Sequence, residues 1–70
     1  MIPKGYMVEE LDVRLPGEPE LTTRFKWRAN WRCKTMEKIR NGTPSYRYEV
    51  VDEGNRYLVV AMQNRLVPMK

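Results

Sequence analysis

Apolar and charged residues alternate most regularly in the segment that follows the first turn of the chain. Every second residue of segment 23–29 is aromatic or small, and polar residues stand between them. A period of two places successive side chains on opposite faces of a β-strand. The pattern predicts a strand with Phe25 and Trp27 in the core and a cationic face exposed to solvent, which holds Arg24, Lys26 and Arg28.

Several boundary signals then favour a helix over about residues 30–41. Asn30 can cap the first turn, and Lys38 and Arg40 place cations in the last turn. Gly42 can adopt positive φ after the helix, and Pro44 prevents its continuation. An apolar stripe near helical spacing could dock this helix on a sheet, and it consists of Ala29, Cys33, Met36 and Ile39. Continuation of the period-two pattern through Cys33 leaves a long bent strand over 21–34 as the alternative.

The last third of the chain predicts a β-hairpin over about residues 45–62. Two runs rich in β-branched and aromatic residues, 46–51 and 56–62, flank a turn in which Gly54 can adopt positive φ. A turn of even length would place one set on a common face: Tyr46, Tyr48, Val50, Tyr57, Val59 and Ala61. Both faces of 58–62 are apolar, which indicates a central strand.

The opening segment suits a strand over about residues 10–15, although its apolar spacing also fits a helix. The sequence Pro16-Gly17-Glu18-Pro19 ends either element. Together these elements predict a small α+β domain with an antiparallel sheet of three or four strands and one helix. An all-β barrel of the SH3-like or OB-like kind is the alternative. We expect one domain over 1–70, with flexible ends at about 1–5 and 64–70.

Charge is distributed unevenly along the 70 residues, whose net charge is +4. Segment 21–47 holds eight Lys or Arg and a single acid, whereas segment 1–20 holds two cations and five acids. Such asymmetry indicates an acidic partner or an anionic polymer.

The residues needed for most catalytic chemistry are missing. The chain has no histidine, which removes the commonest general base and the commonest metal ligand. The single cysteine, Cys33, excludes an internal disulfide and a zinc site built on cysteine pairs. We therefore expect no enzyme, no metal and no cofactor. The lone cysteine and the absence of a long apolar run predict a cytoplasmic protein without a membrane segment.

The cations are the candidate binding residues for nucleic acid or an acidic partner: Arg24, Lys26, Arg28, Arg32, Lys34, Lys38, Arg40 and Arg47. Alternate cations on a strand lie about 6.6–7 Å apart, which suits contacts to successive phosphates. Candidate aromatic contacts are Trp31, Tyr46 and Tyr48, because bases stack on such rings. In the strand predicted over 23–29, however, the rings and the cations face opposite ways and could not serve one ligand. A solvated strand face that discourages aggregation would account for the same cations.

These features predict a small basic binding module that contacts nucleic acid through a cationic strand and helix face. The alternative is a regulator or inhibitor that binds a protein machine. The chain resembles, in general character and not by any motif, accessory proteins of bacteriophages and mobile elements, many of which bind a host RNA polymerase or nuclease. The acidic first third favours this alternative, because it would repel phosphates if it shared the cationic face.

Overall fold

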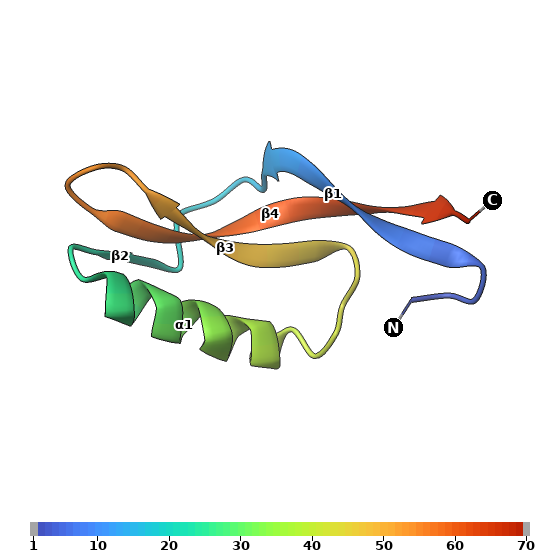
Figure 1. Ribbon diagram of the computed structural model, residues 1–70, viewed down its shortest axis with the longest axis horizontal. Helices are drawn as coiled ribbons and strands as arrows, with labels where there is room; N and C mark the ends of the chain where they lie inside the picture. Colours follow the sequence, from blue (N-terminus) through green and yellow to red (C-terminus); the bar gives the residue numbers. More distant parts are fainter. Residues whose placement is uncertain (1, 70) are drawn as a thin grey trace.

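The sheet is built around its last strand, which pairs with all three others (Figure 1). The computed structural model describes residues 2–69, and its elements are β1 (Tyr6–Arg14), β2 (Leu21–Thr23), α1 (Lys26–Ile39), β3 (Tyr46–Asp52) and β4 (Tyr57–Pro68). All pairings are antiparallel. The α+β class and the antiparallel sheet with one helix are confirmed, and α1 occupies most of the long bent strand that the barrel alternative required over 21–34.

The two edges of β4 are used differently. β3 follows one edge, whereas β1 and β2 occupy successive lengths of the other. Between β1 and β2 the backbone N–H groups of Leu15 and Glu20 still donate to Ala61 (2.9 Å) and Val59 (2.8 Å) of β4. Residues 16–19 leave the ladder, because their prolines have no N–H to donate. The predicted central position of the last strand is therefore confirmed.

The loop between β3 and β4 has an even length, which is the condition for the predicted common face. Asp52 pairs with Tyr57, so four residues connect the strands. Within the loop the Asp52 carboxylate accepts a hydrogen bond from the Gly54 N–H (2.8 Å), and Gly54 has φ +89°, which glycine adopts without strain. Val50 lies opposite Val59 and Tyr48 opposite Ala61, as the predicted common face requires.

The prediction of a strand over 23–29 is wrong. β2 ends at Thr23, whose hydroxyl accepts a hydrogen bond from the Phe25 N–H (3.2 Å), and α1 begins at Lys26 instead of about residue 30. Phe25, not Asn30, precedes the first helical residue. A helix is favoured because Ala29, Cys33 and Met36 are spaced to meet the sheet together. Ala29 is fully buried, since its small side chain allows the helix to approach the sheet closely.

The helix ends close to the predicted boundary. It ends at Ile39 and is followed by Arg40, and the next two residues, Asn41 and Gly42, adopt positive φ of 53° and 74°. Ile39 does not belong to the buried stripe, because it is 67% exposed. The backbone turns here and leads into β3.

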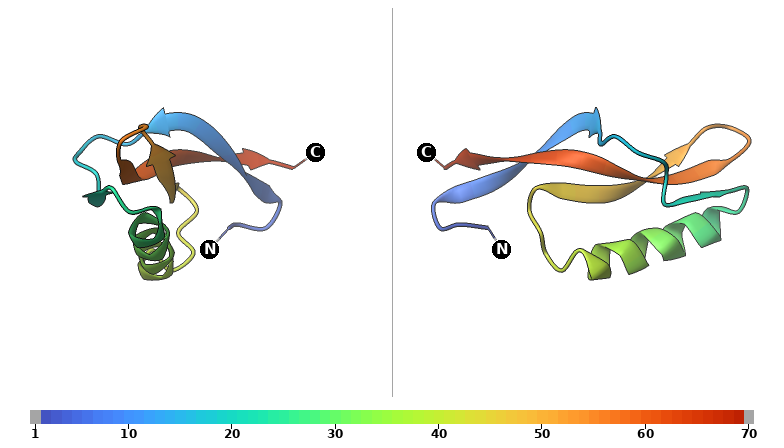
Figure 2. Two further views of the ribbon diagram at one scale, coloured as in Figure 1. Left: turned by 60° about the vertical axis from the view of Figure 1, so that its left-hand side comes forward. Right: turned by 180° about the vertical axis from the view of Figure 1, so that it is seen from behind.

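α1 covers one face of the β3–β4 hairpin, and β1 crosses β4 at a steep angle (Figure 2). On the helix side, the Cys33 thiol lies 3.5 Å from the Tyr48 carbonyl oxygen, to which it donates. On the opposite face, Leu58, Val60 and Met62 of β4 are buried together, with Val51 packed against them. The hydrophobic core is therefore divided between the two faces of one strand.

The first half of β1 and the last residues of β4 extend beyond the helix as a two-stranded ribbon, which gives the molecule its length of 42 Å (Figure 1). We call residues 6–10 and 64–68 the ribbon arm. The structure thus places 64–68 in β4 and not in a tail, and β1 begins at Tyr6, earlier than the predicted residue 10. Of the expected flexible ends, residues 1 and 70 lie outside the described residues. α1, the helix of the described chain, has neither the length nor the apolar character needed to cross a membrane.

Candidate functional site

Both tryptophans of the chain lie on the outside of α1. Trp27 and Trp31 are each 67% exposed, and Phe25 is 48% exposed with its ring centroid 6.3 Å from that of Trp27. The prediction that Phe25 and Trp27 form the core is therefore wrong. In a helix, residue 27 lies far around the axis from Ala29, which is the residue that faces the sheet.

Two lysines continue the line of the tryptophans. Trp27, Trp31, Lys34 and Lys38 are separated by four, three and four residues, which places them on one face of a helix. All four are exposed. We call this set the outer stripe. The aromatic rings and the cations, which a strand would place on opposite faces, thus share one surface. The four-three-four spacing of these residues predicts this surface once residue 27 is assigned to a helix.

Other cations flank the outer stripe. Arg24, Lys26 and Arg28 are exposed near the start of α1, and Arg32 is half-buried one turn further along. Among the described residues, no ion pair or side-chain hydrogen bond forms at six of these cations, which are Arg24, Lys26, Arg28, Arg32, Lys34 and Lys38. The single acid of α1, Glu37, pairs with Arg40. The helix surface therefore carries positive charge that residues 2–69 do not neutralise.

Two of the predicted binding residues have internal roles instead. The Arg40 guanidinium pairs with Glu37 and donates to the Thr43 carbonyl, which holds the turn after the helix. Arg47 is only 9% exposed and lies on the sheet face opposite α1. The structure therefore does not bring Arg47 together with the helix cations.

The two candidate tyrosines lie on the helix side of β3 but apart from the tryptophans. Tyr46 and Tyr48 are half-buried, and their rings meet edge to face with centroids 5.6 Å apart. Burial raises the pKa of Tyr48, and the neighbouring Tyr46 and Glu20 add to this effect. Their edge-to-face contact stabilises the sheet. Of the three aromatic candidates, the structure brings Trp31 alone to the cationic helix face.

A shallow groove of about 520 Å³ runs between α1 and β3, beside the outer stripe. Residues from both elements line it: Asn30, Cys33, Lys34, Glu37, Lys38 and Val50. Lys34 and Lys38 belong to both the groove and the stripe. The sequence does not predict this groove, because it forms where α1 packs beside β3.

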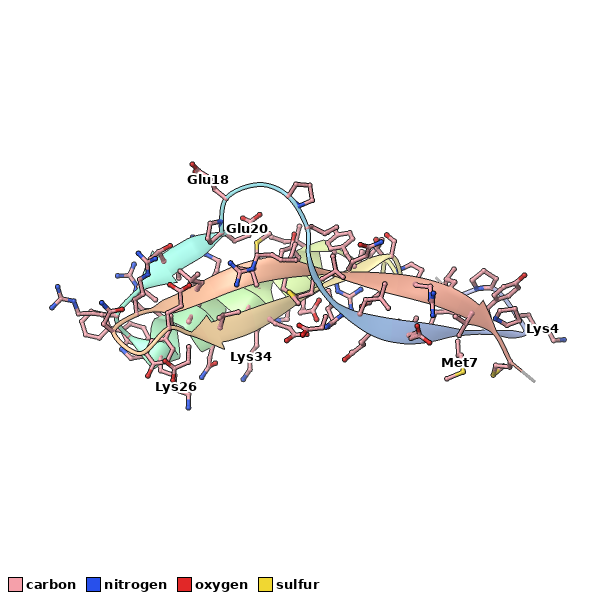
Figure 3. All side chains as sticks on the ribbon, turned by 90° about the horizontal axis from the view of Figure 1, so that it is seen from above. Lys4, Met7, Glu18, Glu20, Lys26 and Lys34 are labelled. Carbon is pink, nitrogen blue, oxygen red and sulfur yellow. The ribbon has the colours of Figure 1, made fainter. Side chains whose placement is uncertain are left out.

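Two acids of the first third of the chain lie away from two of the helix lysines (Figure 3). Glu18 and Glu20 project from one long side of the sheet, whereas Lys26 and Lys34 project from the other (Figure 3). In the ribbon arm, Glu9 pairs with Arg65. Repulsion of phosphates requires acids and cations on one face, and Glu18 and Glu20 lie on the other side of the sheet from Lys26 and Lys34 (Figure 3).

Cys33 lies on the side of α1 that faces β3, and its thiol is half-buried. Burial raises its pKa, and Glu37 and Glu49 raise it further. We expect iodoacetamide to label Cys33 more slowly in the native protein at pH 8 than in urea, because the thiolate is the reactive form. The pKa of Cys33 is higher in the folded protein than its unfolded value of about 8.5. The free energy of unfolding should therefore fall as the pH rises above about 8.5, because the unfolded chain loses the thiol proton first. Cys33→Ser is the labelling control, and equal rates in both states would contradict the assignment.

We find no match for this chain among protein-family profiles, curated proteins or solved structures.

Proposed function

We propose that this protein is a non-enzymatic, cytoplasmic module that binds nucleic acid through α1. The observation that carries the proposal is the outer stripe, in which two exposed indole rings and two lysines share one helix face. Nucleic acids offer the matching chemistry, since phosphates attract the cations and bases stack on aromatic rings. A merely solvated helix face would account for the lysines but not for two tryptophans that are each 67% exposed.

The unpaired cations supply the attraction. Because no acid of the described chain pairs with them, they are available to phosphates, and each phosphate contact releases a condensed counterion. Arg40 and Arg47 do not belong to the six unpaired cations, because their guanidinium groups form hydrogen bonds within the protein. Such contacts confer affinity rather than sequence preference.

Salt dependence tests the proposal directly. If about four of the six cations contact phosphates at once, log affinity should fall against log salt with a slope of roughly −3 to −4. The measurement is a fluorescence-anisotropy titration of a random-sequence oligonucleotide at several salt concentrations from about 25 to 200 mM. Absence of binding at the lowest salt would refute direct nucleic-acid binding.

A protein partner is the second candidate, and the ribbon arm is the observation that favours it. Tyr6 (43%), Met7 (50%) and Leu66 (36%) are exposed on this arm, and β3 does not extend far enough to cover that part of β4. Exposed apolar residues beside an unpaired strand edge suit a partner that adds a strand. This candidate predicts a discrete protein recovered by pull-down and lost on Met7→Asp, with no binding to oligonucleotides.

A further inference from the structure

We infer that the ligand of α1 is a single-stranded nucleic acid, with unpaired bases stacked on Trp27 and Trp31. This inference rests on the proposed function and specifies which form of nucleic acid the helix accepts. It begins from the exposure of the two rings, which are 67% exposed each and project beyond the packed face of the helix.

The spacing of the rings favours bases that are separated from each other. Trp27 and Trp31 are four residues apart, which corresponds to about 6 Å along a helix axis. Neighbouring base pairs of a duplex are about 3.4 Å apart and cover each other's faces. Two rings at the wider spacing can each receive a base only if the strand is unstacked, as a single strand readily is.

The lysines fix where the backbone of that strand would run. Lys34 and Lys38 follow Trp31 by about 4.5 and 10.5 Å along the helix axis. They also border the groove between α1 and β3. A strand whose bases cover the tryptophans can therefore continue past both ammonium groups on the same face. Duplex DNA would meet these lysines equally well but would leave the indole rings without a base face to contact.

The chain supplies its own reporter, because Trp27 and Trp31 are its two tryptophans. The titration measures intrinsic fluorescence against three probes at equal salt: a 12-nucleotide oligo-dT strand, a 12-base-pair duplex, and inorganic polyphosphate with a similar number of charges. We expect strong quenching and at least tenfold tighter binding for oligo-dT than for the duplex, and little quenching by polyphosphate.

Single substitutions then separate stacking from charge. Trp27→Ala and Trp31→Ala should each weaken oligo-dT binding by roughly tenfold while leaving the salt slope unchanged, because no phosphate contact is removed. Ile39→Ala is the matched control, since Ile39 is equally exposed on the same helix but lies off the outer stripe. Circular dichroism verifies the fold of each variant, which should be retained because all three side chains are exposed.

The outcomes distinguish this inference from the proposed function. Equal affinity for duplex and single strand, or tryptophan variants that bind oligo-dT normally, would overturn the inference and leave nucleic-acid binding in place. Polyphosphate that binds and quenches as strongly as oligo-dT would overturn it as well. Failure of all three probes at low salt would overturn both, and would direct attention to a protein that binds the tryptophans.

Discussion

Replacing Arg47 with methionine is expected to lower the free energy of unfolding by about 3 kcal/mol, because several hydrogen bonds from a charged donor are lost at once. The guanidinium donates to the Asn64 side chain (2.6 Å), the Gln63 carbonyl (3.0 Å) and the Leu11 carbonyl (3.2 Å). Methionine retains much of the apolar stem and leaves these acceptors without their donor.

The position of Arg47 explains why this effect should be large. Its carboxylate neighbours are Glu49 on β3 and, at 3.7 Å, Glu10 on β1. The contact with Leu11 falls where β1 departs from regular pairing between Glu10 and Arg14, so the arginine satisfies a carbonyl in the irregular stretch of that strand. One buried side chain thus connects three strands.

The measurement is urea unfolding followed by circular dichroism. A domain of this size has a total stability of roughly 3.5–10 kcal/mol, so Arg47→Met should shift the midpoint substantially or unfold the protein. Arg56→Met is the matched control: Arg56 is exposed and, within the described part of the chain, its side chain pairs with Glu53 alone, so its loss should cost less than about 1 kcal/mol. Equal effects of the two substitutions would contradict the structural role of Arg47.

Reversing the charge of both lysines in the outer stripe is expected to have the largest effect on binding. The double variant Lys34→Glu/Lys38→Glu should weaken oligonucleotide affinity by roughly 100-fold and reduce the salt slope by about two, because two phosphate contacts are replaced by repulsion. Both side chains are exposed and unpaired in the described chain, so the fold should remain intact. Fluorescence anisotropy with a labelled single strand measures both quantities.

The matched control changes the net charge equally at a distance from α1. Lys4 lies at the far end of the molecule, and Arg65 lies on the ribbon arm, where it pairs with Glu9 (Figure 3). Lys4→Glu/Arg65→Glu should weaken binding by less than about fivefold, because only the long-range field changes and salt screens it. Equal loss in the two double variants would indicate attraction to overall charge without a defined surface.

The candidate site illustrates where sequence reasoning reaches its limit. The segregation of cations in 21–47 is a property of the chain, and it identified the region that the structure makes into α1. Whether rings and cations meet on one face depends on the local period, and residues 23–34 fit both a period of two and a helical repeat. A strand over this segment would place Trp27 and Lys26 on opposite faces. The helix places Trp27 on the same face as Lys34 and Lys38.

The sequence by itself determined the hairpin, the central position of β4 and the end of the helix. These depend on local chemistry: β-branched runs around a turn containing Gly54, and positive φ at residues 41 and 42. The tertiary structure decided which apolar residues are buried. Ala29 is buried against the sheet and Trp27 and Trp31 are exposed, whereas Arg47 is buried and donates to the Leu11 carbonyl in the irregular stretch of β1. The choice between strand and helix over residues 23–34 follows from packing against the sheet, because the local pattern fits both.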